Sequence, residues 1–154
     1  MPQDRLHITL HCLGHFEGSI PNGVLDLALA VGNAMDEEPF DVAFDVLRCR
    51  GGAGVDGTLE LGGKGPAVRG LRRFQHGLGG TMRRMGFSED RIRTRFVPHI
   101  TLDYAHERVD PRTVTPIAWR VTQFCVVDSH YGQGRHEVLA RWPLRARQQE
   151  FGDW

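Results

Sequence analysis

A tetrapeptide with the residues for proton transfer, HITL, occurs twice in the chain, at residues 7–10 and at residues 99–102. On a β-strand, residues i and i+2 share a face, so the histidine and the threonine of each copy project together. Histidine exchanges protons near neutral pH because its reference pKa is about 6.5. A threonine hydroxyl donates a hydrogen bond to an anionic oxygen. Two such pairs have the groups for phosphoryl transfer without a metal.

The repetition favours a shared site, because a single H-x-T on a strand is usually a pair of surface residues, whereas two identical copies point to internal similarity. We expect His7 and His99 to act as the acid–base pair, with their ring nitrogens about 5–8 Å apart across one cleft. Thr9 and Thr101 should hold phosphate oxygens. The isoleucine and leucine of each copy should face the core.

The elements that position these residues are predicted from hydrophobic periodicity. Alternation predicts strands at 5–13, 40–49, 58–61, 97–104, 119–127 and 136–142. Spacing of three and four predicts helices at 23–36 and 67–86, the second one rich in glycine. A glycine-rich loop at 50–57 and a turn at 129–135 join neighbouring strands. Short connections favour antiparallel pairing, so the fold class is α+β.

The chain has the size and composition of one globular domain, with 154 residues, 40% of them hydrophobic. Its 19 basic and 19 acidic residues cancel, but residues 1–62 carry a net charge of −7 and residues 63–100 one of +7. All but one of the basic residues are arginine. This is consistent with anion recognition and equally with arginine-rich codon usage.

The lack of a recognisable targeting signal and the pattern of cysteines indicate a cytoplasmic protein. No apolar run is long enough to span a membrane, and the N-terminus lacks the apolar stretch of a signal peptide. Three widely spaced cysteines, Cys12, Cys49 and Cys125, disfavour a disulfide framework and a zinc site. We expect them to be buried free thiols.

Three segments carry a family resemblance: LHITLHCLG at 6–14, FVPHITLDY at 96–104 and VVDSHYGQGRHEVLARWPL at 126–144. They resemble the 2H phosphoesterase superfamily, in particular its bacterial 2′-5′ RNA ligase branch, whose members act as RNA 2′,3′-cyclic phosphodiesterases. The resemblance implies a single domain over 1–154. Its fold would be α+β (LigT-like), with two pseudo-symmetric lobes, antiparallel sheets and a central cleft. Members usually carry a further strand and helix before the first motif, so the resemblance also implies that this chain lacks them and leaves one sheet edge uncovered.

The activity implied by the resemblance is metal-independent hydrolysis of a 2′,3′-cyclic phosphate, on RNA or on a nucleotide, to a 2′-phosphate. The reverse reaction would join RNA ends through a 2′-5′ linkage. The resemblance assigns His7 as general acid and His99 as general base, with no cofactor and no protein partner. Arg93 and Arg95 precede the second motif, and an arginine there is expected to bind phosphate or the RNA backbone, with a solvated loop as the alternative. Arg95 is the phosphate-binding candidate.

Other functions are also compatible with the sequence. One is a non-catalytic RNA-binding module, and another is a phosphodiesterase for a small nucleotide, such as a cyclic ADP-ribose phosphate or a 2′,5′-linked oligonucleotide. His7, His11 and His15 are spaced as metal ligands on a helix would be, but alternation favours a strand with His11 beside His7 in the cleft. His130 and His136 flank a turn and could approach the cleft, although a surface position is favoured. The GQGR turn (132–135) could offer N–H groups to a phosphate or simply form the hairpin.

Overall fold

The fold is α+β, as predicted. A computed structural model describes residues 3–51, 57–130 and 132–146. Three short 3-10 helices are η1 (Gln3–Arg5), η2 (Gly65–Val68) and η3 (Glu89–Arg91). The longer elements are α1 (Asn22–Ala34), β1 (Phe40–Arg50), β2 (Gly57–Gly62), α2 (Arg69–Met85), β3 (His99–His106), β4 (Arg112–Val121), β5 (Gln123–His130) and β6 (Arg135–Pro143).

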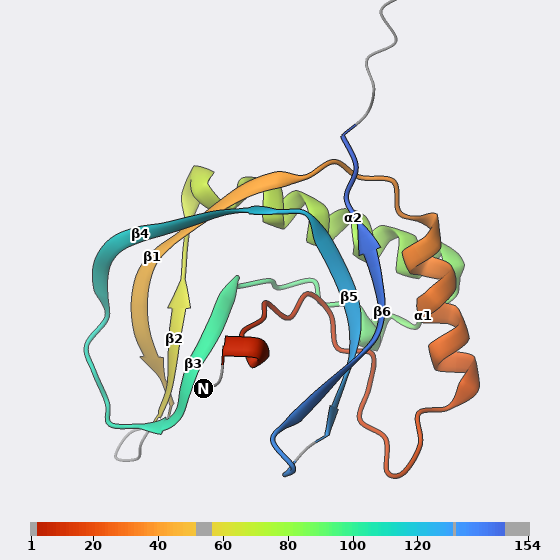
Figure 1. Cartoon of the computed structure of the whole chain (residues 1–154), viewed down its shortest axis with the longest axis horizontal. Helices are drawn as coiled ribbons and strands as arrows, with labels where there is room; N and C mark the ends of the chain where they lie inside the picture. The colour runs from red at the N-terminus through yellow and green to blue at the C-terminus, as the bar shows by residue number, and fades with distance from the viewer. Residues whose placement is uncertain (1–2, 52–56, 131, 147–154) are drawn as a thin grey trace, which may run out of the picture.

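The strands form two antiparallel sheets of unequal size (Figure 1). One has four strands in the order β3-β2-β1-β4, and the other is the β5–β6 hairpin. A single residue separates the end of β4 from the start of β5, so the chain passes from one sheet to the other there. The two predicted antiparallel sheets are confirmed. Their sizes, four strands and two strands, differ more than the expected pseudo-symmetry of the lobes implies.

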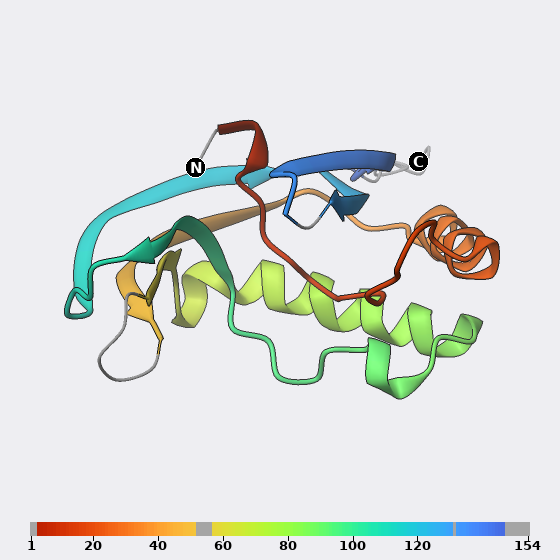
Figure 2. The ribbon, with the colours of Figure 1, turned by 90° about the horizontal axis from the view of Figure 1, so that it is seen from below.

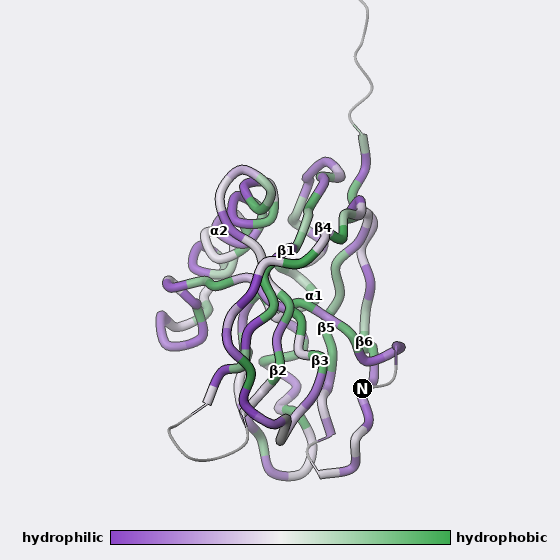
Figure 3. Tube along the Cα trace, turned by 90° about the vertical axis from the view of Figure 1, so that its left-hand side faces the viewer, coloured by the Kyte–Doolittle hydropathy of each residue, from purple (hydrophilic) through white to green (hydrophobic). Residues whose placement is uncertain are grey.

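Helix α2 lies under both sheets and α1 lies at the end next to the β5–β6 hairpin (Figure 2). Hydrophilic and hydrophobic residues alternate along the turns of α2, as an amphipathic helix requires (Figure 3). The helix is unbroken despite its glycines. Two of them permit close packing: a Cβ at Gly70 would come within 3.0 Å of Phe40, and one at Gly79 within 3.1 Å of His11. Gly86 ends the helix in the left-handed conformation, with φ +114°.

Two hydrophobic clusters divide the core. The first fills the space between α1, α2 and β5–β6, and its buried members are Ala28, Val31, Phe74, Leu78, Met82, Phe87, Ile92 and Leu144. The second lies between α2 and the four-stranded sheet, with Val42, Phe44, Leu61, Val68, Leu71 and Phe96. None of the helices in the described ranges is long and apolar enough to cross a membrane.

The strand predicted at 119–127 is wrong, because this stretch covers the end of β4 and the start of β5. The prediction missed the first part of β4, which contains Pro116. Proline removes a ladder hydrogen bond, but β4 is an edge strand and tolerates it there. The expected burial of the thiols is also wrong, since Cys12 and Cys125 are exposed and Cys49 is only partly buried; all three are free.

Candidate functional site

The first HITL copy is not part of a strand, contrary to the prediction for 5–13. Residues 3–5 form η1, and residues 6–16 are extended but carry no strand assignment. A strand requires a hydrogen-bonded neighbour, and no described strand pairs with this segment. The second copy does lie on a strand, since residues 99–102 open β3.

The two copies nevertheless lie together. Ile8 and Leu10 of the first copy pack against the same hydrophobic cluster as Ile100 and Leu102 of the second. Figures 1 and 2 show the N-terminal segment passing beside the start of β3, between the four-stranded sheet and the β5–β6 hairpin. The expectation that these apolar residues face the core is therefore confirmed. The alternation turns the histidine and threonine of each copy away from that cluster.

His7 and His99 are held in the same way. The Nδ1 of His7 donates a hydrogen bond to the carbonyl oxygen of Arg5 at 2.7 Å, and the Nδ1 of His99 donates one to the carbonyl of Val97 at 2.9 Å. In each case the acceptor is two residues earlier in the chain. Because a carbonyl only accepts, both rings carry a proton on Nδ1, and Nε2 is the nitrogen left to exchange a proton.

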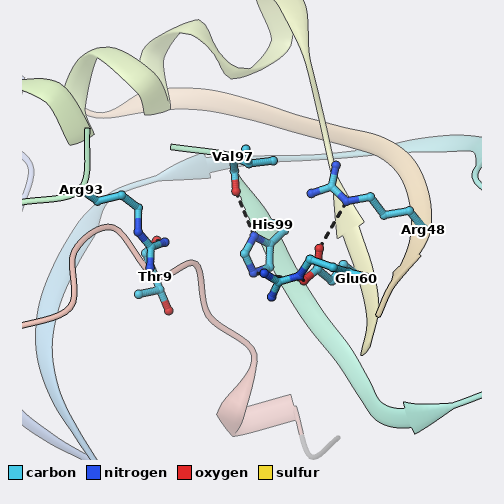
Figure 4. Close-up of polar contacts among 7 residues, drawn as sticks. Thr9, Arg48, Glu60, Arg93, Val97 and His99 are labelled. Atoms are coloured by element: carbon cyan, nitrogen blue, oxygen red, sulfur yellow. Dashed lines mark hydrogen bonds and ion pairs between the residues drawn. The ribbon is translucent and has the colours of Figure 1, made fainter. Parts of the chain in front are cut away.

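A buried carboxylate lies beside His99 (Figure 4). Glu60 is fully buried, and its Oε1 is 3.5 Å from the Nε2 of His99. The same oxygen accepts a hydrogen bond from the Nε of Arg50 at 2.8 Å, and Oε2 accepts one from the Nε of Arg48 at 3.3 Å. Two guanidinium groups thus balance the single buried negative charge, as a buried carboxylate requires.

The register of the sheet builds this cluster. Glu60 on β2 stands opposite Arg48 on β1 and opposite Thr101 on β3, and directly paired residues share a face of the sheet. The sequence analysis did not select Glu60, Arg48 or Arg50. Their signal was an Arg-x-Arg facing a lone glutamate across the predicted hairpin, which becomes a contact only when the strand register is known.

The predicted phosphate-binding residues occupy different settings. Thr9 and Thr101 are partly buried, and their hydroxyls form no hydrogen bond within the described chain. The Nη1 of Arg93 lies 3.5 Å from the carbonyl oxygen of Thr9, so Arg93 reaches the first HITL copy (Figure 4). Arg95 is exposed on the loop before β3 and makes no hydrogen bond or ion pair with the described residues. The contacts therefore link Arg93, rather than Arg95, to the first copy.

His11 is a packing residue, so its prediction as a cleft neighbour of His7 is wrong. Its Nε2 donates to the backbone oxygen of Gln75 on α2 at 3.0 Å, and its Nδ1 accepts from the backbone N–H of Arg93 at 3.0 Å. Burial lowers the pKa of His11, and the charge of Arg93 lowers it further, against the hydrogen bond to Gln75. Both ring nitrogens are occupied, which rules out the metal site of His7, His11 and His15.

His136 is partly buried against His7, so the favoured expectation of a surface position is wrong, and the contact supports the alternative in which His136 approaches the first motif. The two ring centroids are 4.9 Å apart, and the rings meet edge to face at 64°. Burial lowers the pKa of His136, as do the nearby charges of His7 and Arg5, while Asp4 acts in the opposite direction. No spacing in the sequence indicated this contact, which arises where the β5–β6 hairpin meets η1.

One group in the described ranges gathers three side chains of the kind that bind metals: Asp128, His130 and Glu137. The Nε2 of His130 is 3.6 Å from Asp128 and 3.2 Å from Glu137. A guanidinium nitrogen of Arg135 lies 3.3 Å from the same Nε2. With a permanent cation already at the ring nitrogen, the group is explained as a surface ion-pair network.

Solved structures share this fold over nearly the whole chain. TT0787 of Thermus thermophilus matches with a TM-score of 0.72 and 28% identity, over 94% of this chain and 81% of that chain. LigT of E. coli, solved with 3′-AMP, matches with a TM-score of 0.64 and 28% identity, over 93% and 79%. A structure described as a phosphoesterase matches with a TM-score of 0.65 and 27% identity, over 93% and 79%. Family models and curated protein sequences gave no match.

Proposed function

The chain belongs to the LigT-like branch of the 2H phosphoesterase superfamily, and we propose that it hydrolyses 2′,3′-cyclic phosphates on RNA or nucleotides to 2′-phosphates. One observation carries the proposal: His7 and His99 are each anchored through Nδ1 to a carbonyl two residues earlier, which leaves two matching Nε2 atoms for proton transfer. That a relative was solved with 3′-AMP supports a substrate with phosphate on the ribose.

The reaction needs one proton taken and one given. His99 removes a proton from water, and the water oxygen attacks phosphorus. The bond between phosphorus and O3′ breaks, and His7 donates its proton to O3′, which leaves a 3′-hydroxyl and a 2′-phosphate. The two histidines then return to their starting protonation states by exchange with solvent. This requires the two Nε2 atoms to lie about 5–8 Å apart across one phosphate.

The threonines stabilise the charge that develops on the phosphate. The hydroxyls of Thr9 and Thr101 are free of partners in the described chain and can donate to the non-bridging oxygens of the phosphate. With a 5′-hydroxyl in place of water as the nucleophile, the same groups would join a 2′,3′-cyclic phosphate end to that hydroxyl through a 2′-5′ linkage, because the bond between phosphorus and O3′ breaks in the same way. The two histidine side chains carry out both proton transfers of this scheme.

The test is hydrolysis of adenosine 2′,3′-cyclic phosphate in the presence of EDTA, with the product identified by chromatography. We expect turnover that EDTA does not change and a product that is only the 2′-phosphate. The 3′-phosphate as product, or activity that is lost with EDTA and restored by zinc, would contradict the scheme. Binding of the nucleotide or of RNA without any turnover would favour a binding module.

A further inference from the structure

A second feature of the site is Arg50, whose Nε is hydrogen-bonded to Glu60 while the rest of its guanidinium group is exposed. The Nε of Arg50 and the Nε2 of His99 both contact Oε1 of Glu60, at 2.8 Å and 3.5 Å. Because they share one oxygen atom, the guanidinium and the imidazole are neighbours. The Arg50 side chain is 69% exposed, so its outer nitrogens reach solvent next to the nitrogen proposed to act on substrate.

The charge of this cluster favours an anion. Arg48 and Arg50 carry two positive charges and Glu60 one negative charge, so the set keeps an excess of one positive charge beside His99. The 3.5 Å separation between His99 and Glu60 is longer than a normal hydrogen bond, so the carboxylate does not saturate Nε2. A guanidinium matches a phosphate because its planar N–H groups bind two oxygens together.

The two arginines differ in what they offer. Arg48 is 28% exposed and bonds the other carboxylate oxygen, Oε2, so it mainly balances the buried charge. Among the residues that the structure describes, Arg50 bonds Glu60 through Nε and no other group, which leaves both terminal nitrogens for another partner. Fixing a long side chain in advance reduces the conformational entropy lost on binding. Glu60 thus orients a group that is otherwise mobile at a protein surface.

We propose that Arg50 binds the phosphate group of the substrate next to His99 and that the buried Glu60 is the positioning residue that holds it there. This inference rests on the proposed function for the identity of the substrate, but an anion site at Arg50 can be tested without turnover. The ligand class is a ribose 2′-phosphate or 2′,3′-cyclic phosphate. The residue lies on β1, far in sequence from both HITL copies.

The experiment measures binding of adenosine 2′-monophosphate by calorimetry, and hydrolysis of the cyclic nucleotide, for the wild type and Arg50→Ala. We expect Arg50→Ala to weaken binding by about 10- to 100-fold, the scale of a lost charge-assisted hydrogen bond. The matched control is Arg120→Ala, since Arg120 is also an exposed arginine of the same sheet that pairs with a carboxylate, Asp41. The control should bind as the wild type does.

Two further variants separate binding from folding. Arg50→Lys keeps the charge that Glu60 needs but not the planar fork, and should bind with intermediate affinity. Glu60→Gln keeps the side-chain size and should raise KM more than it lowers kcat, because Arg50 stays present but is less ordered. Thermal melts show whether each variant folds. If Arg50→Ala does not fold, the affinity of Arg50→Lys decides whether Arg50 binds the phosphate.

The outcomes distinguish the two proposals. Binding that depends on Arg50 without turnover by the wild type would keep the anion site and overturn the hydrolase. Turnover by the wild type with unchanged affinity in folded Arg50→Ala and Arg50→Lys would overturn the role of Arg50 and keep the hydrolase. If the wild type neither binds nor hydrolyses these nucleotides, both proposals are wrong.

Discussion

The imidazole of His11 accepts a hydrogen bond from the backbone N–H of Arg93 at 3.0 Å. This bond joins the segment that carries the first HITL copy to the loop that leads into the second. The same ring donates to the backbone of Gln75, so it also fixes both segments to α2. Since the first copy has no strand partner among the described residues, this contact substitutes for the hydrogen-bond ladder of a sheet.

Replacing His11 with alanine should destabilise the protein by about 1–3 kcal/mol, because the backbone N–H of Arg93 and the carbonyl of Gln75 lose a partner in a partly buried place. Urea unfolding at pH 7.5 measures the change. His76→Ala is the control, since His76 is exposed on α2. Equal stabilities of the two variants would show that the His11 contact does not support the fold.

His11 should also make the protein sensitive to acid. Burial lowers its pKa in the folded state, so the unfolded chain takes up a proton first as pH falls. The free energy of unfolding should therefore decrease below about pH 6.5 and stop changing from this cause below the pKa of the folded state. Unfolding curves between pH 7.5 and 5 should show a smaller loss for His11→Ala than for the wild type.

Alanine at His7 or at His99 should each reduce kcat by about 10²- to 10⁴-fold, the usual scale for a positioned acid or base. The double variant should be little worse than either single one, because each histidine completes the proton cycle of the other. Rates on adenosine 2′,3′-cyclic phosphate measure this. Near-normal activity of only one single variant would contradict a paired mechanism.

Much of the frame follows from local pattern. Alternation predicts β1 and the β2 hairpin, helical spacing predicts α1 and α2, and the two HITL copies share a core cluster as their apolar residues indicated. The strands and helices among these features depend on residues close in sequence. The first HITL copy differs from the prediction, because its alternating residues form a segment that is not hydrogen-bonded to a neighbouring strand. Whether a segment joins a sheet depends on such a neighbour, which the local sequence does not specify.

The parts of the site that escaped prediction depend on register and packing. Glu60 stands between two leucines on β2, and its burial among arginines follows only from the pairing of β1 with β2 and of β2 with β3. His136 meets His7 only because the hairpin lies against η1. His11 is the opposite case. The sequence predicted it beside His7 in the cleft, but in the structure it bonds the backbone of α2 and of the loop before β3.

Gly62→Ala should reduce activity at a site that touches no substrate. Gly62 pairs with His99 across β2 and β3, and a Cβ there would lie 2.9 Å from the carbonyl oxygen of Pro98, so β3 must shift at the residue before His99. A displacement of about 1 Å at a catalytic group costs up to about 10²-fold in rate. Gly23→Ala is the control, because its added Cβ meets nothing within 4 Å. Equal kcat values in the two variants would contradict this reasoning.

The protonation of His136 should report on its neighbours. Burial, His7 and Arg5 lower its pKa, and Asp4 raises it, so in the folded protein its midpoint should fall below the ordinary value of about 6.5. Arg5→Gln removes a positive charge and should raise the midpoint, whereas Asp4→Asn removes a negative charge and should lower it. The shift of the His136 ring proton with pH, followed by NMR, measures each value. A shift of the same sign in both variants would show that the charges of Arg5 and Asp4 do not set the pKa of His136.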